Sequence, residues 1–336
     1  MEYIRPLPLT DAAAPADALP LAGGWCRFSH VELISREAPP RVVPVGEVAP
    51  ERLAPLTAPR PAFAGLPMDR PQIMGILNVT PDSFSDGGLF LAPQAAMMAA
   101  RDMASAADII DIGGESTRPG AAEVTVEEET ARTAPVIAAL RAGGIARPIS
   151  IDTRKAAVAR AALASGAAIV NDVTALRFDP AMARLVAESQ APVILMHSIA
   201  TPATMQDDPR YDDVLLDVYD ALAERVEAAV AAGIPRARIA IDPGIGFGKT
   251  LAHNLTLLAR LSLFHGLGLP VLLGASRKRF IGTLSGVEDA ARRMPGSLAV
   301  ALAGVAQGVQ VIRVHDVAET RQALSLWQAV TRGSDA

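Results

Sequence analysis

The sequence has little of several features that mark particular classes of protein. Cys26 is the one cysteine among 336 residues, so no internal disulfide can form, which favours a reducing compartment. No apolar run approaches the roughly 18 residues of a membrane span. The N-terminus lacks the basic stretch and apolar segment of a secretory signal. We therefore expect a cytoplasmic protein that does not associate with membranes.

The chain also lacks an excess of positive charge. Its formal net charge is −5, which gives no general field for nucleic acid, so any recognition of anions must be local. Only three of the 31 basic residues are lysines, namely Lys155, Lys249 and Lys278. Either a compact charge is needed at these positions or the small number is chance.

Residues 1–70 hold twelve of the 26 prolines, spaced too closely for a helix of ordinary length. Residues 25–34 resemble a strand, and residues 41–45 an edge strand. We predict that residues 1–70 form a proline-rich, partly β-structured extension that packs on the domain formed by residues 71–336. An independent N-terminal domain is the alternative.

Eight short apolar runs in residues 71–336 each end at polar or small residues. Continuous apolar runs indicate parallel strands covered on both faces, and eight of them alternating with helices predict a (β/α)₈ TIM barrel in the α/β class. The runs are 73–77, 109–112, 149–151, 168–170, 193–196, 239–241, 271–273 and 309–312. Helices are predicted at 93–107, 124–142, 155–165, 211–232, 297–306 and 317–330.

In such barrels the chemistry lies at the carboxyl ends of the strands. Asn78 follows the first run and offers an amide oxygen suited to Mg²⁺ bound with a substrate phosphate. Phe84, in the long loop that follows, is either a stray apolar contact or a ring presented to a flat substrate. Arg118, in the second loop between Gly113 and Gly120, can reach a phosphate or carboxylate.

Two carboxylates and an amide end the third, fourth and sixth runs. Asp152, Asn171 and Asp242 suit a flat heterocycle rich in N–H groups, because ionised carboxylates only accept hydrogen bonds. Each aspartate could instead cap the following helix, and Asp152 is the more ambiguous of the two. The acidic residues 127–129 are interpreted as complementing a helix dipole rather than as a metal site.

Positive charge gathers after the last two strands. Ser276, Arg277 and Lys278 follow the seventh run, and Arg313 and His315 follow the eighth. Barrel enzymes commonly bind phosphate at these loops, so we expect an anion site there. Residues 244–250 imitate a phosphate-binding loop, but Pro243 stands where its first glycine is required, and we reject that interpretation.

From residue 71 onward the chain closely resembles the dihydropteroate synthase family. The resemblance rests on five ordered motifs: residues 78–88, 114–120, 242–249, 276–278 and 313–315. It implies a cytoplasmic, homodimeric, Mg²⁺-dependent transferase of folate synthesis that joins 6-hydroxymethyl-7,8-dihydropterin diphosphate to p-aminobenzoate and releases pyrophosphate. Sulfonamides would mimic the aminobenzoate.

The resemblance also implies roles for individual residues. The pterin would be held by Asp152, Asn171, Asp242 and Lys278, with Met196 lining its pocket and Arg313 along the ring. The diphosphate and Mg²⁺ would be held by Asn78, Arg313 and His315. The aminobenzoate site would comprise Phe84, Thr117, Arg118, Pro119, Phe247, Ser276 and Arg277, and Asp86 would order the first loop. Catalysis would rest on Asp86, Arg118, Lys278, Arg313 and His315.

Two alternatives share the barrel. A pterin-binding methyltransferase domain would not need the Ser-Thr-Arg-Pro loop at 116–119 or the Arg-Val-His corner at 313–315. A non-catalytic pterin-binding homologue would lose one of these anion groups. The chain departs from the family pattern at Arg279 and at residues 198–200, neither of which is an implied contact.

Overall fold

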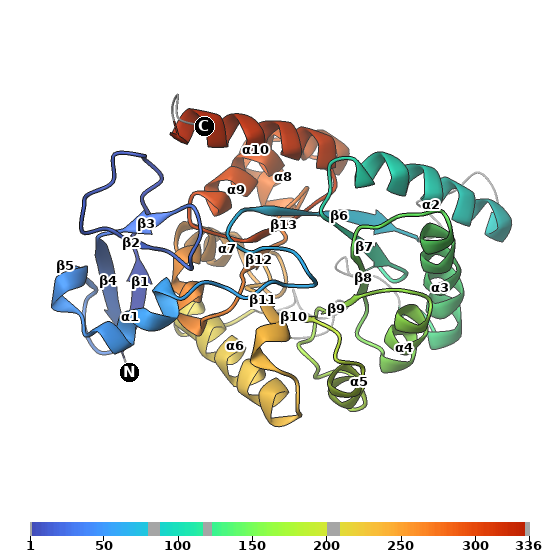
Figure 1. Ribbon diagram of the computed structural model, residues 1–336, viewed down its shortest axis with the longest axis horizontal. Helices are drawn as coiled ribbons and strands as arrows, with labels where there is room; N and C mark the ends of the chain where they lie inside the picture. The colour runs from blue at the N-terminus through green and yellow to red at the C-terminus, as the bar shows by residue number, and fades with distance from the viewer. Residues whose placement is uncertain (1, 80–87, 117–122, 200–208, 333–336) are drawn as a thin grey trace.

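Eight parallel strands form a nearly closed barrel in the computed structural model, which describes residues 2–79, 88–116, 123–199 and 209–332 (Figure 1). Neighbouring strands are paired in the order β11-β10-β9-β8-β7-β6-β13-β12. A parallel bridge between Ile241 and Val271 joins the two ends of this series. The strands are β6 (Gln72–Asn78), β7 (Ile109–Gly113), β8 (Ile149–Asp152), β9 (Ile169–Asp172), β10 (Val193–Met196), β11 (Ile239–Asp242), β12 (Leu272–Leu273) and β13 (Val311–Val314). All eight predicted strands are confirmed.

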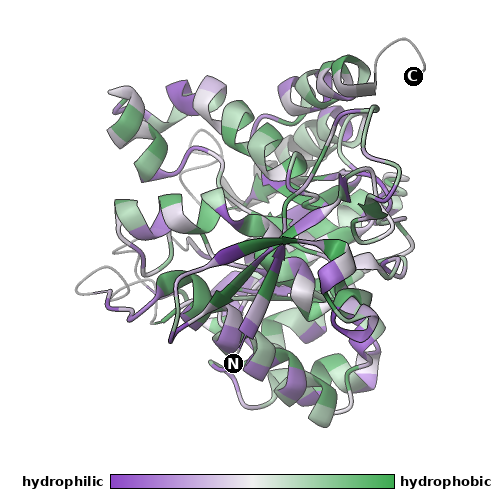
Figure 2. Cartoon of the chain, turned by 90° about the vertical axis from the view of Figure 1, so that its left-hand side faces the viewer, coloured by the Kyte–Doolittle hydropathy of each residue, from purple (hydrophilic) through white to green (hydrophobic). Residues whose placement is uncertain are grey.

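Helices connect the strands on the outside of the barrel. The six predicted helices are present as α2 (Gly88–Ala104), α3 (Val126–Ala142), α4 (Ala156–Ala164), α6 (Val214–Ala231), α9 (Met294–Val305) and α10 (Val317–Arg332). The structure adds α5 (Met182–Ser189), α7 (Leu251–Ala259) and α8 (Arg279–Ser285), each at most nine residues long. Hydrophobic and hydrophilic residues alternate along the helices (Figure 2), as expected where one face packs on the strands.

Alternation along the strands divides the barrel interior into two layers. Because side chains of a strand point to opposite faces in turn, the residues two positions after an inward apolar residue also point inward. The lower interior layer comprises Met74, Ile109, Ile169, Ile194, Ala240, Leu272 and Val311, all buried in one cluster. Two residues later stand Ile76, Asp111, Asn171, Met196, Asp242, Gly274 and Arg313. The interior therefore changes from apolar to polar toward the carboxyl ends.

The N-terminal residues form small sheets beside the barrel (Figure 1). Strands β1 (Glu2–Pro6), β4 (His30–Ser35) and β5 (Arg41–Pro44) make an antiparallel sheet in the order β1-β4-β5, so β5 lies at an edge as predicted. A second pair comprises β2 (Leu19–Pro20) and β3 (Arg27–Phe28). The expectation of no ordinary helix needs one correction, α1 (Pro50–Thr57). Pro50 lies in its first turn, where no N–H donor is needed.

These N-terminal residues contact the barrel in two ways. Trp25 donates from its indole nitrogen to the Val305 carbonyl of α9 over 2.9 Å, and the Ser262 hydroxyl donates to the Pro6 carbonyl over 2.8 Å. Phe63 and Met68, each 1% exposed, pack into the lower interior layer. The barrel is thus closed by apolar side chains at the end opposite the polar layer. No helix in the described part of the chain is long and apolar enough to cross a membrane.

Candidate active site

Arg313, on β13, lies at the centre of the polar interior layer. Its Nε donates to Asp111 Oδ2 over 2.6 Å, and its Nη2 donates to Asp152 Oδ2 over 2.7 Å. Both carboxylates are buried. One guanidinium therefore serves two carboxylates that belong to β7 and β8.

Because Arg313 is shared with Asp111, its positive charge only partly offsets the cost of burying the Asp152 carboxylate. Burial raises the pKa of Asp152 from 3.8 to about 7; Arg313 opposes this rise, and Asp111 adds to it. Asp152 is not a helix cap, because α4 begins after Lys155 and has no side-chain cap. The alternative of a capping role is thereby excluded.

Asp111 is a site residue that the sequence interpretation missed. It is completely buried in the middle of β7, and its Oδ2 also accepts from Asn171 Nδ2 over 3.3 Å. The signal was present, because a carboxylate within an apolar strand is rarely buried unless it is paired. The Oδ1 atoms of Asp111 and Asp152 are buried without a hydrogen-bond partner among the described residues.

Asp242 ends β11 on the other side of Arg313. Its Oδ1 accepts from the Gly244 N–H over 2.7 Å, and burial raises its pKa against the opposing effect of Lys278. Gly274 separates Asp242 from Arg313, since a Cβ built at this glycine would lie 3.5 Å from Asp242 Oδ2 and 3.9 Å from Arg313 Cδ. Met196 pairs in register with Asp242 on the neighbouring strand β10.

Lys278 approaches the polar layer from the loop after β12. Its Nζ donates to the Ile245 carbonyl and lies 4.4 Å from the centre of the Phe247 ring. Burial lowers the pKa of Lys278 from 10.5 to about 8, although Asp242 opposes that shift. The structure therefore brings together Asp152, Asn171, Met196, Asp242, Phe247, Lys278 and Arg313, as predicted.

Lys249 has a structural role in the loop that follows Asp242. Its buried Nζ donates to the carbonyls of Gly244 and Phe247 over 2.9 Å each, and lies 3.0 Å from His197 Nδ1. A phosphate-binding lysine would point outward, so the rejection of a phosphate loop is upheld. Gly244 has a φ of +68°, and a Cβ there would lie 1.9 Å from the His197 carbonyl oxygen. Glycine is therefore required at this position.

Ser276, Arg277 and His315, which are predicted to bind an anion, make two separate sets of contacts. His315 Nδ1 lies 3.0 Å from Ser276 Oγ, and the same oxygen accepts from the His315 N–H over 3.2 Å. Arg277 instead pairs with Asp316, with 3.0 Å between Nε and Oδ2. Its backbone has a φ of +58°, a left-handed conformation that is strained for a residue other than glycine.

Asn78, the predicted metal ligand, ends β6 beside β7. A Cβ built at Gly113 would lie 3.6 Å from Asn78 Oδ1 and 3.7 Å from Asp152 Cβ, so this amide faces the polar layer. Within the described residues no group of three His, Cys, Asp or Glu side chains could hold a metal ion. A single amide oxygen fits Mg²⁺ that takes its remaining ligands from phosphate and water.

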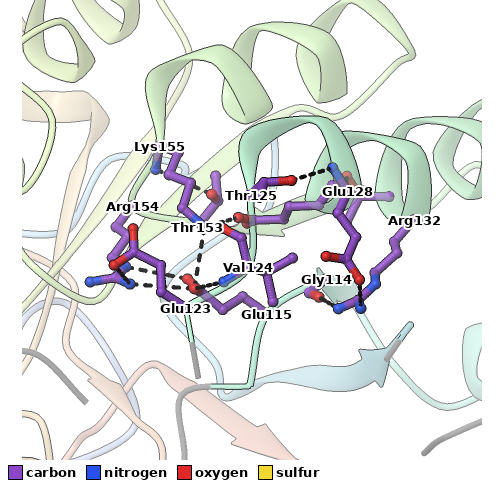
Figure 3. Close-up of polar contacts among 12 residues, drawn as sticks. Gly114, Glu115, Glu123, Val124, Thr125, Glu128, Arg132, Thr153, Arg154 and Lys155 are labelled. Atoms are coloured by element: carbon purple, nitrogen blue, oxygen red, sulfur yellow. Dashed lines mark hydrogen bonds and ion pairs between the residues drawn. The ribbon is translucent and has the colours of Figure 1, made fainter. Parts of the chain in front are cut away.

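The acidic run 127–129 contains both exposed and buried residues. Glu128 is exposed and fits the interpretation that the run complements the helix dipole. Glu129 corrects that interpretation, because its side chain is completely buried and pairs with Lys155 over 2.7 Å. Lys155 Nζ also donates to the Val124 carbonyl over 2.6 Å, so this ammonium group is bound within the protein beside α3 (Figure 3).

The other predicted site residues, Phe84, Asp86, Thr117, Arg118 and Pro119, lie outside the described residues.

Comparison with known proteins agrees with this geometry. Residues 74–315 match the family model described as pterin binding enzyme. The dihydropteroate synthase of Escherichia coli is 48% identical over 265 residues, which cover 79% of this chain and 93% of that protein. That of Neisseria meningitidis serogroup C is 48% identical over 267 residues, with 78% and 94% covered.

Solved structures give the same result. A Xanthomonas albilineans dihydropteroate synthase with 4-aminobenzoic acid has a TM-score of 0.76 and 50% identity, covering 81% of this chain and 98% of that one. The same enzyme in complex with 7,8-dihydropteroate has a TM-score of 0.73 and 48% identity, with the same coverage. A Yersinia pestis dihydropteroate synthase with a sulfonamide drug has a TM-score of 0.74 and 47% identity, covering 79% and 96%. With a family model matched over most of its length, relatives about 48% identical and the same barrel in solved structures, the chain belongs to the dihydropteroate synthases, transferases of folate biosynthesis.

Proposed function

We propose that this chain joins 6-hydroxymethyl-7,8-dihydropterin diphosphate to p-aminobenzoate and releases pyrophosphate. The C–O bond to the diphosphate breaks, a C–N bond to the amine forms, and the amine loses one proton. The observation that carries the proposal is the polar interior layer, where Asp111, Asp152, Asn171 and Asp242 surround Arg313. Carboxylate acceptors in this number suit a ring with several N–H donors.

The pterin would bind among these acceptors. Asp242 would use Oδ2, because Oδ1 already accepts from Gly244. Asp152 would accept from the ring in place of Arg313, leaving the guanidinium to lie along the ring. Asn171 and Lys278 would supply further contacts, and Met196 an apolar wall. This arrangement holds the ring while the bond to the diphosphate breaks.

The diphosphate would lie toward Arg313, His315 and Asn78. Among the described residues that form the polar layer, there is no serine, cysteine or lysine that could attack the pterin as a nucleophile. The cation and N–H donors of this layer would instead stabilise the departing diphosphate. We therefore infer that the diphosphate leaves before the amine attacks. Mg²⁺, held by Asn78 together with the diphosphate oxygens, would neutralise charge on the leaving group.

The aminobenzoate site would include Ser276, Arg277 and Phe247, together with Phe84, Thr117, Arg118 and Pro119. Asp86 would order the first loop. The left-handed backbone of Arg277 supports a functional role there, because strained conformations gather at functional sites. The carboxylate of bound p-aminobenzoate would compete with Asp316 for the guanidinium of Arg277.

We further propose that the protein acts as a cytoplasmic homodimer, and that residues 1–70 are an extension to a catalytic barrel formed by 71–336. The closure of the barrel by Phe63 and Met68 supports a structural purpose for the extension. Sedimentation of the purified protein tests the dimer, which requires twice the monomer mass of 35.0 kDa.

The test is release of pyrophosphate by the full chain. Product should form only when the pterin diphosphate, the aminobenzoate and Mg²⁺ are all present. A pterin-binding methyltransferase or a non-catalytic homologue would bind pterin yet release no pyrophosphate. Full turnover in excess chelator would refute the role proposed for Mg²⁺ while leaving the transferase activity intact.

A further inference from the structure

One peptide group in the loop between β11 and α7 joins a buried amide to Lys278. The carbonyl of Ile245 accepts a hydrogen bond from Lys278 Nζ. The N–H of the same peptide belongs to Gly246 and donates to Asn254 Oδ1 over 2.6 Å. This 245–246 peptide is trans, and in a planar trans peptide the carbonyl and the N–H point in opposite directions. The side chain that holds the N–H therefore also fixes the direction of the carbonyl.

Asn254 uses both ends of its amide on this loop. It is the fourth residue of α7, and its side chain is buried, with the residue 3% exposed. Its Nδ2 donates to the Thr250 carbonyl over 2.8 Å and lies 3.4 Å from the Lys249 carbonyl oxygen. An amide suits this position because it accepts at one atom and donates at the other. Asn254 thus ties the start of α7 to the middle of the loop.

Gly246 lets the loop backbone approach the Lys278 side chain closely. Its φ is +82°, and a Cβ built there would lie 2.9 Å from Lys278 Cδ, so a larger residue would displace that side chain. The centre of the Phe247 ring lies 4.4 Å from Lys278 Nζ. Lysine has large rotamer freedom, so a fixed surface for its side chain reduces the ordering that remains when a substrate binds.

The contacts of Lys249 hold other parts of the loop. Its Nζ donates to the carbonyls of Gly244 and Phe247 over 2.9 Å each, and neither contact involves the 245–246 peptide. A hydrogen bond to a peptide N–H also strengthens the bond that its carbonyl accepts, because hydrogen bonds in a chain polarise one another. Asn254 therefore acts on the peptide that receives the lysine of the pocket, whereas Lys249 does not.

We propose that Asn254 is a positioning residue for the pterin, acting on Lys278 through the 245–246 peptide. The inference rests on the proposed contact between Lys278 and the pterin. While Asn254 holds the N–H, the carbonyl keeps the amino group of Lys278 in place before the substrate arrives. Without Asn254 the peptide can rotate, and the amino group loses its acceptor.

A double-mutant cycle, followed by calorimetry of pterin diphosphate binding, tests the proposal. Asn254→Ala leaves the Gly246 N–H without this acceptor and should weaken binding about tenfold. Lys278→Met removes the amino group on which Asn254 acts. In the Lys278→Met background, Asn254→Ala should therefore change the affinity by less than about twofold. Equal effects of Asn254→Ala in the two backgrounds would overturn the proposal, as would no effect in the unaltered protein.

Two control variants separate positioning from stability. Asn254→Asp keeps an acceptor for the Gly246 N–H but loses the amide donor, so it should lower the melting temperature and leave pterin affinity within about twofold. Thr250→Ala removes the cap of α7, where the hydroxyl accepts from the His253 N–H over 3.2 Å, and should have the same two effects. If pterin affinity falls in these controls as far as in Asn254→Ala, loosening of α7 explains the result and the proposal is wrong.

Melting curves establish that each variant is folded before its binding is measured. If Asn254→Ala does not fold, Asn254→Leu takes its place in the cycle, because leucine fills the space of the amide without offering an acceptor. Lys278→Met alone is the reference for the proposed function. Unchanged pterin affinity in that variant would show that the assignment of Lys278 to the pterin is wrong, whatever the Asn254 variants do.

Discussion

The titration of Asp152 gives a quantitative prediction for pterin binding. Burial raises its pKa to about 7, so below neutral pH the carboxyl is protonated in the free protein. A protonated carboxyl presents a donor where the pterin needs an acceptor. Because affinity falls with the fraction of the competent form, the apparent dissociation constant for the pterin should rise about tenfold per pH unit below pH 7.

Asp111→Asn perturbs this titration directly. Asp111 is buried, shares Arg313 with Asp152, and adds to the rise in the Asp152 pKa. Removing its charge should lower the pKa of Asp152 by about 1 unit or more, so pterin affinity should persist to more acidic pH. The raised pKa of Asp152 also affects the stability of the protein. Between about pH 4 and about pH 7 the folded state retains a proton that the unfolded chain has released, so the free energy of unfolding falls as the pH rises through this range.

Calorimetry of pterin binding between pH 5 and pH 8 measures this shift. Asp108→Asn is the control, because Asp108 lies directly before β7, away from the polar layer, where it pairs with Arg321 and accepts from the Ile73 N–H. It should leave the midpoint unchanged. An unshifted midpoint in Asp111→Asn, or equal shifts in both variants, would refute the coupling of the two carboxylates through Arg313.

Two further predictions concern stability. Phe63→Ala should lower the free energy of unfolding by roughly 3–5 kcal/mol, because Phe63 is buried at the closed end of the barrel; denaturant titration checks this, and both KM values should stay unchanged. A large rise in either KM would show that the N-terminal residues reach the active site. Burial lowers the pKa of Lys249 from 10.5 to about 7. Between these two pH values the unfolded chain binds a proton that the folded protein has released, so the free energy of unfolding should rise with pH over this range. Lys249→Met should abolish a rise on the order of a few kcal/mol, measured by the same titration at pH 7 and above; an unchanged pH dependence would contradict the buried, lowered pKa.

The strands could be predicted because burial on both faces leaves little freedom in their composition. Each apolar run, such as residues 193–196, is confirmed as a strand. The short helices α5, α7 and α8 were missed, since seven to nine residues give only about two turns of periodicity. The helix at Pro50–Thr57 cannot be predicted from the number of prolines, because a proline in the first turn, such as Pro50, is compatible with a helix.

The site could be predicted where a polar residue ends a strand, and less well where it lies inside one. Asp152, Asn171 and Asp242 are predicted as site residues because each follows an apolar run, and the structure places all three in the polar layer. Asp111 was passed over because isoleucines surround it, although its alternation with Ile109 places it in the barrel interior. Which buried polar residues become partners depends on the register between strands that are far apart in the sequence. The pairing of Arg313 with Asp111 joins residues 202 positions apart.

The central claim is that strand-end carboxylates of the polar layer bind the pterin, and the affinity of Asp242→Asn tests it most directly. Asp242 Oδ1 accepts from Gly244, so the new amide nitrogen should take the place of Oδ2 and face the N–H donors of the ring. A mispaired buried polar group costs about 1–3 kcal/mol, and calorimetry should show at least about tenfold weaker binding. The control is Asp172→Asn, because Asp172 is equally buried but accepts from Thr174 and Leu176. The account predicts weakened binding in Asp242→Asn alone, and unchanged affinity in that variant would contradict it.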